Sequence, residues 1–230
     1  MDEKNDNYQF VLEPIHDFSG SLIAYELLTK FSAPGGTFYF RKDEKNHFYK
    51  LSQSERLSIF RRQIALLCDL YQRNDIAPKI SVNIDKDIAG EITSSCSLQE
   101  KISQMPLLRF EICEFFSSNY DNDEFLLLKK LTKICPLWLD NFGAGNSNLT
   151  LVMKGGFEYV KIEKNFFWQH GSSNAFRDLI SHLNAYCEGV IVEGIEHASH
   201  EEKLRTLDIT GMQGHHWDPV KVDAIRKQLH

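Results

Sequence analysis

Short apolar runs recur along this chain, and most are followed by a longer segment with the periodicity of an amphipathic helix. The apolar runs predict eight strands, at residues 10–15, 22–28, 80–84, 107–113, 137–140, 159–162, 190–193 and, more weakly, 209–213. Helical spacing predicts helices at residues 53–71, 98–105, 123–134, 173–186, 200–207 and 220–228. Strands that alternate with helices are typical of an α/β fold with a parallel sheet.

The first two runs are joined only by the letters HDFSGS, which is short enough for a hairpin. Parallel neighbours need a long crossover, so the first strand is expected to run antiparallel to the second. Eight strands in 230 residues, with no break in the pattern, favour a modified (β/α)8 barrel of the TIM type with an antiparallel first strand. We expect one domain over residues 1–230, and a doubly wound open sheet is the alternative fold.

Composition narrows the classes of partner. The chain carries 32 acidic and 26 basic residues, a formal net charge of −6, which argues against a polynucleotide but not against one small nucleotide held through metal ions. The charged N-terminus and the absence of a long apolar run predict a cytoplasmic protein with no membrane partner. Five cysteines without a CxxC pair make a disulfide framework or a structural zinc site an unfavourable interpretation.

Seven of the predicted strands carry one polar residue inside or at the end of the apolar run. They are Glu26, Asn83, Glu111, Asp140, Lys161, Glu193 and Gln213. One such residue alone would indicate only a solvated strand end. Because the carboxyl ends of barrel strands meet at one mouth, seven in successive strands predict a single site there.

The predicted cluster is rich in hard oxygen ligands. Carboxylates and an amide suit Mg²⁺ or Mn²⁺, and no cysteine or histidine joins the set as zinc would prefer. Two such ions can clamp a phosphodiester and generate a hydroxide. The glycine-containing loop after Asp140 is a weak phosphate-loop signal, since no lysine follows in the expected position, and a helix is expected to start near Ser147. His215 and His216 are adjacent on a predicted strand end and are interpreted as structural or rim residues.

The motifs LEPI, YELLTKF, SVNID, FEICE, LDNFGAGNSNL, YVKIEKNF, VEGIE and QGHHWDP occur in this order. With this set the chain resembles the EAL domain of cyclic-di-GMP phosphodiesterases over nearly its whole length. The resemblance implies a modified barrel with an antiparallel first strand. It also implies hydrolysis of cyclic di-GMP to linear pGpG with Mg²⁺ or Mn²⁺.

The resemblance assigns roles by position. The metal ligands are Glu26, Asn83, Glu111, Asp140 and Asn141. Lys161 matches the lysine that orients the attacking water, and Glu193 matches the general base or second-metal ligand. Substrate-binding positions are Glu13, Leu28, Lys30, Glu196 and Gln213. Glu114 matches a residue that anchors the loop after Asp140, and that loop with its helix implies a homodimer.

At several positions the chain departs from the family pattern, and these departures bear on whether it is an active phosphodiesterase. The signature reads Glu-Leu-Leu at residues 26–28, the family threonine is Ala144, the glutamine before the Pro-Ile pair is Glu13, and the arginine is Lys30. Most important, the family's Asp-Asp pair is Asp140 followed by Asn141, which removes one negative charge from the second metal site. The alternative is therefore a weak or inactive EAL protein that senses ligand or binds a protein partner, such as a regulator of motility or fimbriae.

Overall fold

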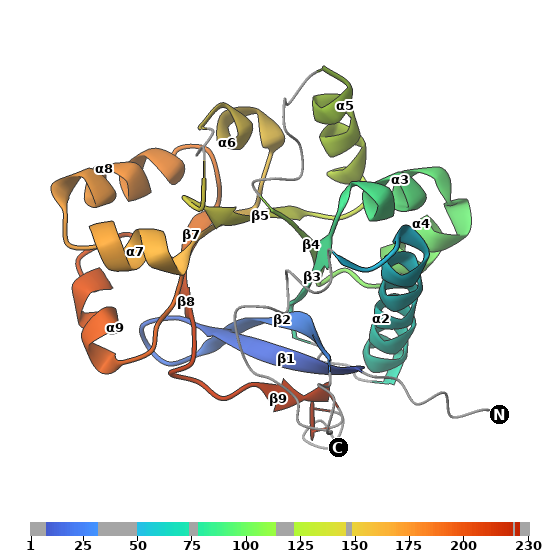
Figure 1. Ribbon diagram of the computed structural model, residues 1–230, viewed down its shortest axis with the longest axis horizontal. Helices are drawn as coiled ribbons and strands as arrows, with labels where there is room; N and C mark the ends of the chain where they lie inside the picture. The colour runs from blue at the N-terminus through green and yellow to red at the C-terminus, as the bar shows by residue number, and fades with distance from the viewer. Residues whose placement is uncertain are drawn as a thin grey trace.

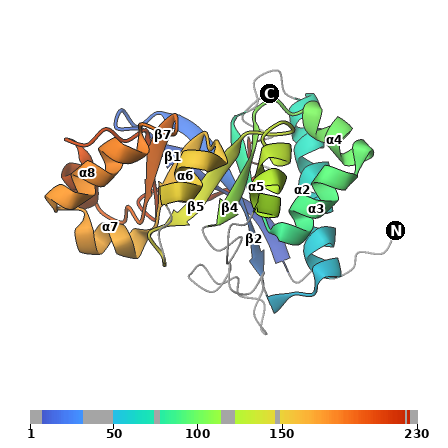
Figure 2. The same cartoon turned by 90° about the horizontal axis from the view of Figure 1, so that it is seen from above.

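The computed structural model of the protein describes residues 8–31, 50–73, 78–113, 122–145, 149–222 and 224–225. The described strands are β1 Tyr8–His16, β2 Leu22–Phe31, β3 Ile80–Ile84, β4 Leu108–Cys113, β5 Leu137–Phe142, β6 Tyr159–Ile162, β7 Gly189–Glu193, β8 Gly211–Gln213 and β9 Val220–Lys221. The described helices are α2 Gln53–Arg73, α3 Lys86–Ser94, α4 Cys96–Ser103, α5 Asn122–Leu131, α6 Leu149–Gly155, α7 Lys164–His170, α8 Asn174–Leu183 and α9 Ala198–Leu204. The helices lie around the outside of the strands (Figures 1 and 2).

The strands close into a barrel. Strands β2 to β8 are hydrogen-bonded in chain order and run parallel, while β1 is antiparallel to both β2 and β8 and closes the ring. Closure confirms the predicted modified (β/α)8 barrel with an antiparallel first strand, and the open-sheet alternative is wrong. The hairpin turn between β1 and β2 has Gly20 at φ +79° and three hydrogen bonds to Asp17 Oδ1, which explains why residues 17–21 suffice to join the strands.

The predicted helix at residues 220–228 is wrong at its start. Val220 and Lys221 form β9, which pairs antiparallel with Leu12 and Val11 of β1. Strand β8 pairs with β1 only through two residues, so the rest of that β1 edge needs another partner for its backbone. The helical spacing of apolar residues over 220–228 carries no information about this missing backbone partner of β1.

Two helices were not predicted, α3 and α7. Both have clear N-caps, since Asp85 accepts a hydrogen bond from Ile88 N and Glu163 accepts from Asn165 N and Phe166 N. These caps are a local start signal that a search for apolar periodicity alone does not use. Among the residues described here, none of the helices combines the length and apolar character needed to cross a membrane.

Successive side chains along each strand point alternately out of the barrel and into it, and this divides the apolar core into two parts. Side chains such as Val82, Phe110 and Leu139 point outward and pack with the helices in the main core. Ile15, Ala24, Trp138 and Ile191 form a separate buried cluster, with Ile23 and Tyr159 packed against it. Their strand positions place this cluster inside the barrel, where it fills the lumen and leaves the carboxyl ends of the strands for polar groups.

Candidate active site

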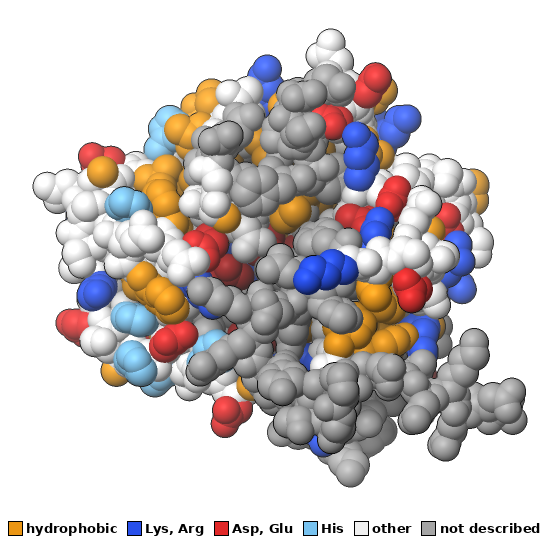
Figure 3. Space-filling view, in the orientation of Figure 1, with side chains coloured by type: hydrophobic (Ala, Val, Ile, Leu, Met, Phe, Trp, Pro, Cys, Tyr) orange, Lys and Arg blue, Asp and Glu red, His pale blue; other side chains and the backbone are white. Residues whose placement is uncertain are grey.

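Lys161 lies at the centre of the predicted polar cluster. Its Nζ atom is 2.7 Å from Glu26 Oε2, 2.9 Å from Glu111 Oε2, 3.2 Å from Glu193 Oε1 and 3.7 Å from Asp140 Oδ1. These five side chains come from five different strands, and barrel closure is what brings them together. Acidic side chains are visible in a hollow near the centre of the face in Figure 3.

The electrostatics of this cluster favour added cations. Burial by itself would lower the pKa of Lys161, but the carboxylates, led by Glu111 and Glu26, raise it well above its usual value. The ammonium therefore stays charged near neutral pH. Four carboxylates around one ammonium still leave an excess of negative charge in a buried site, which is costly unless further positive charge arrives.

Amide side chains orient the central carboxylates. Asn83 Nδ2 donates a 2.6 Å hydrogen bond to Glu26 Oε1, and Gln213 Nε2 donates one of 2.8 Å to Glu26 Oε2. Ser81 Oγ donates a short hydrogen bond to Glu111 Oε1. Ser81 was not among the predicted site residues, although its position two residues before Asn83 on the same strand face was an available signal.

Asp140 and Asn141 lie at an irregularity in the barrel wall. The pairing of β5 with β6 is interrupted between Leu139 and Phe142, and Asn141 has φ +59°. Asparagine tolerates this left-handed conformation better than most residues do. Asn141 Nδ2 donates a 2.6 Å hydrogen bond to Asp140 Oδ2, so the amide occupies one oxygen of the neighbouring carboxylate.

The predicted substrate-binding residues of β1 and β2 lie on the same side of the wall. Glu13 pairs directly with Glu26, and Leu28 and Lys30 follow Glu26 at two-residue intervals on β2. Burial raises the pKa of Glu13, and the charge of Glu26 raises it further. Lys30 is buried and Leu28 half-buried, so neither is a simple surface residue.

The other predicted residues differ in position. Glu196 lies at the rim, where its Oε1 is 3.4 Å from His215 Nδ1, and Gln213 is buried at the end of β8. Glu114 and residues 146–148 of the loop after Asp140 lie outside the described residues. Their predicted roles in loop anchoring and in a dimer contact therefore stay predictions.

The donor set fits Mg²⁺ or Mn²⁺ in its chemistry. Carboxylate and amide oxygens converge, and in the part of the chain that the structure describes, Gln213 Oε1 is buried without a hydrogen-bond partner. Within those same residues, no three acidic, histidine or cysteine side chains form a ready-made metal shell. Several carboxylates instead face Lys161 Nζ. To bind metal ions, their oxygen atoms would have to contact both the ammonium group and the incoming ions.

A family comparison now decides the classification. The family model described as "EAL domain" matches residues 2–219. The chain belongs to the EAL domain family. Enzymes of this family use divalent metals, in agreement with the hard oxygen donors at this site.

Relatives of this EAL protein carry two different descriptions. "Cyclic di-GMP phosphodiesterase PdeH" of Escherichia coli K12 is 31% identical over 194 residues, which cover 81% of this chain and 73% of that protein. "Anti-FlhC(2)FlhD(4) factor YdiV" of Salmonella arizonae is 25% identical over 231 residues, covering 98% of this chain and 96% of that protein. A crystal structure of the EAL-like domain protein YdiV matches with a TM-score of 0.80 at 22% identity, covering 97% of this chain and 96% of that one.

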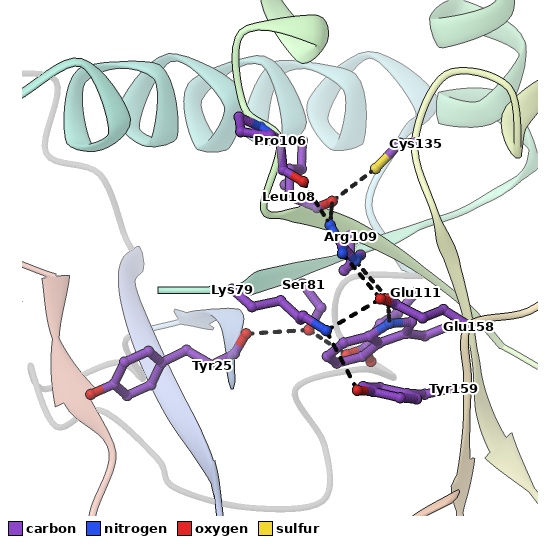
Figure 4. A network of polar contacts seen from close by, with 11 residues as sticks. Tyr25, Lys79, Ser81, Pro106, Leu108, Arg109, Glu111, Cys135, Glu158 and Tyr159 are labelled. Carbon is purple, nitrogen blue, oxygen red and sulfur yellow. Dashed lines mark hydrogen bonds and ion pairs between the residues drawn. The ribbon is translucent and has the colours of Figure 1, made fainter. Parts of the chain in front are cut away.

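The EAL barrel has a second buried polar network near the amino ends of its strands. Glu158 accepts a hydrogen bond from Arg109 Nε (2.5 Å), and Lys79 Nζ lies 3.2 Å away (Figure 4). Trp138 Nε1 donates a further hydrogen bond of 2.6 Å to Glu158. Burial alone would raise the pKa of Glu158, but the bonds from Arg109 and Trp138 hold it below its usual value. These residues were not predicted as site residues, and the catalytic groups of such barrels lie at the opposite, carboxyl ends of the strands.

Proposed function

We propose that this EAL protein hydrolyses cyclic di-GMP to linear pGpG with the help of Mg²⁺ or Mn²⁺. The observation that carries the proposal is the cluster around Lys161, in which four buried or half-buried carboxylates from different strands share one ammonium. Burying several carboxylates around one ammonium is costly, and bound divalent cations would offset that cost. The similarity to PdeH gives independent support.

The residues suggest a division of roles. Glu26, Asn83, Glu111 and Asp140 would hold the ions, with Asn141 as a weaker neutral ligand of the second ion. When bound, the ions supply Lewis-acid activation of water and neutralise the phosphodiester.

Lys161 would orient the attacking water through its ammonium protons. Glu193 would accept the proton that the water loses. The side chain of Glu193 is 16% exposed, whereas those of Glu26, Glu111 and Asp140 are at most 2% exposed, so Glu193 is the carboxylate best placed to exchange protons with solvent. Glu13, Leu28, Lys30, Glu196 and Gln213 would then line the substrate-binding opening.

A product assay tests the proposal. Purified protein with Mg²⁺ or Mn²⁺ should convert cyclic di-GMP to pGpG, and Glu26→Ala should lower the rate by roughly 100-fold or more, because even residues behind metal ligands are worth about 10- to 100-fold. Glu202→Ala, an exposed charge on α9, is the matched control and should leave the rate unchanged. Equal rates for Glu26→Ala and the unmodified protein would refute the proposed reaction.

A second function is a ligand sensor or protein-binding factor. It is favoured by the similarity to YdiV along almost the whole chain. It is also favoured by two departures from the family pattern, since Asn141 replaces a charged aspartate and Glu13 replaces a neutral glutamine. Calorimetric titration with cyclic di-GMP in Ca²⁺ separates the cases. Binding without pGpG formation in Mg²⁺ or Mn²⁺ would indicate a sensor, and neither binding nor turnover would indicate a protein-binding role.

The homodimer implied by the loop after Asp140 belongs to this proposal as well. Leu149 and Met153 of α6, which follows that loop, are exposed at 37% and 51%. Exposed apolar side chains on one helix are compatible with a contact between copies.

Asn141→Asp should raise hydrolysis by roughly 10-fold, because a second carboxylate strengthens binding of the second ion. The same change replaces the Asn141 hydrogen bond to Asp140 with a repulsion between adjacent carboxylates. We therefore expect a lower unfolding temperature without metal and a larger increase on adding Mn²⁺ than the unmodified protein shows.

Both effects of Asn141→Asp can be measured on one preparation, by the pGpG assay and by thermal unfolding with and without Mn²⁺. Asn174→Asp at the start of α8 is a control for the same chemical change at an exposed site. A rate that stays flat or falls would mean that position 141 does not limit the reaction.

A further inference from the structure

The turn that follows β7 is held from outside the barrel by two helices. Trp168 of α7 donates a hydrogen bond from Nε1 to the carbonyl oxygen of Gly194, at 2.9 Å. His200 of α9 places Nδ1 3.0 Å from the same oxygen and 3.3 Å from the backbone nitrogen of Glu196. Gly194 comes directly after Glu193, so both contacts act on the backbone that carries the proposed base.

The conformation of this turn leaves it little freedom. Gly194 is buried at φ +84°, and a Cβ atom there would collide with Lys164 of α7. On the next residue, Ile195 N donates to Gln213 O at 3.0 Å and Ile195 O accepts from His216 N at 2.9 Å. The turn is therefore fixed on the β8 side by backbone bonds and on the helix side by Trp168 and His200.

Trp168 is a partly exposed residue of α7, with 38% of its surface accessible. Lys164 Nζ lies 5.7 Å from the centre of its ring on one side, and only the indole N–H reaches the Gly194 oxygen. The hydrogen bond from the indole N–H is directional, so it is the most specific contact that this side chain makes with the turn. Removing that donor should change where the turn lies more than how stable the barrel is.

We propose that Trp168, together with His200, is a positioning residue that holds the Glu193 carboxylate 3.2 Å from Lys161 in the geometry needed for proton removal. This inference rests on the proposed hydrolysis, since it gives Glu193 its role. The effect of Trp168 and His200 passes through the Gly194 carbonyl.

Kinetics provide the first test. Trp168→Phe keeps an aromatic ring but loses the donor, and it should lower kcat for cyclic di-GMP by about 10-fold, because small displacements of a reacting group are costly, while KM stays within about twofold. Gln169→Ala, the exposed neighbour on α7, should change neither constant. His200→Asn, which keeps an amide donor close to the position of Nδ1, should retain more activity than His200→Ala.

Hydrogen exchange provides a second test that does not need turnover. Exchange measured by mass spectrometry over residues 192–197 should be faster in Trp168→Phe than in the unmodified protein, with an unchanged unfolding temperature and unchanged exchange in β3. If the unmodified protein forms no pGpG, the proposed hydrolysis fails, and this measurement still decides whether Trp168 fixes the turn. Unchanged exchange, or a fall in kcat that is matched by a fall in unfolding temperature, would overturn the positioning role.

Discussion

Lys161→Met is expected to lower the free energy of unfolding by about 3–5 kcal/mol in metal-free buffer, because removing one partner of a buried ion pair leaves the other uncompensated. Here four carboxylates lose the ammonium group that lies between them and remain close together at the barrel mouth. They are those of Glu26, Glu111, Asp140 and Glu193. Methionine has a similar length and removes the charge without opening a large cavity. Urea denaturation at neutral pH measures the loss.

Divalent cations should restore part of this stability. In Lys161→Met, Mg²⁺ or Mn²⁺ becomes the main source of positive charge for the carboxylates, so the metal-dependent gain in unfolding temperature should exceed that of the unmodified protein. Lys203→Met, at an exposed position of α9, should change neither the stability nor the response to metal. Equal metal responses in Lys161→Met and the unmodified protein would show that the cluster does not bind these ions.

The pH dependence of the Lys161 contribution has a definite sign. The folded protein raises the pKa of Lys161, so its stabilising effect is fully present below the ordinary lysine value of 10.5 and is lost as the pH rises through the raised value. The difference in stability between Lys161→Met and the unmodified protein should therefore be retained from neutral pH up to about pH 10.

Glu158→Gln is expected to lower the free energy of unfolding by roughly 3 kcal/mol while leaving the binding of cyclic di-GMP unchanged. The substitution leaves the buried Arg109 and the nearby Lys79 without their shared carboxylate. Its position near the amino ends of β4 to β6 separates it from the proposed site. Urea denaturation and calorimetric titration in Ca²⁺ measure the two quantities on one preparation.

The effect of Glu158→Gln should shrink in acid. Because the folded protein lowers the pKa of Glu158, its contribution is present above the ordinary value of 4.5 and is lost as the pH falls through the lowered value. The control is Glu188→Gln, at an exposed residue just before β7, which should have little effect at any pH. A destabilisation that stays constant below pH 4.5 would contradict the ion-pair explanation.

The positions of the eight barrel strands follow directly from local sequence patterns. Each predicted run overlaps an observed strand, because the apolar residues that fill the helix-facing core of a barrel must recur in every strand. The hairpin between β1 and β2 was also predictable, since six residues cannot make a parallel crossover. The polar residue in seven of the eight runs indicated the mouth, because the functional side chains of such barrels come from the carboxyl ends of the strands.

The sequence by itself therefore determined the fold class and the chemical types gathered at the mouth. Only the tertiary structure decided that Lys161 shares its charge among four carboxylates, that Ser81 holds Glu111, and that Trp168 and His200 contact the Gly194 carbonyl after Glu193. It also placed β9 against β1 and Glu158 against Arg109. These contacts join residues that are far apart in the chain, and their geometry depends on barrel closure and strand register, which no local pattern of residues encodes.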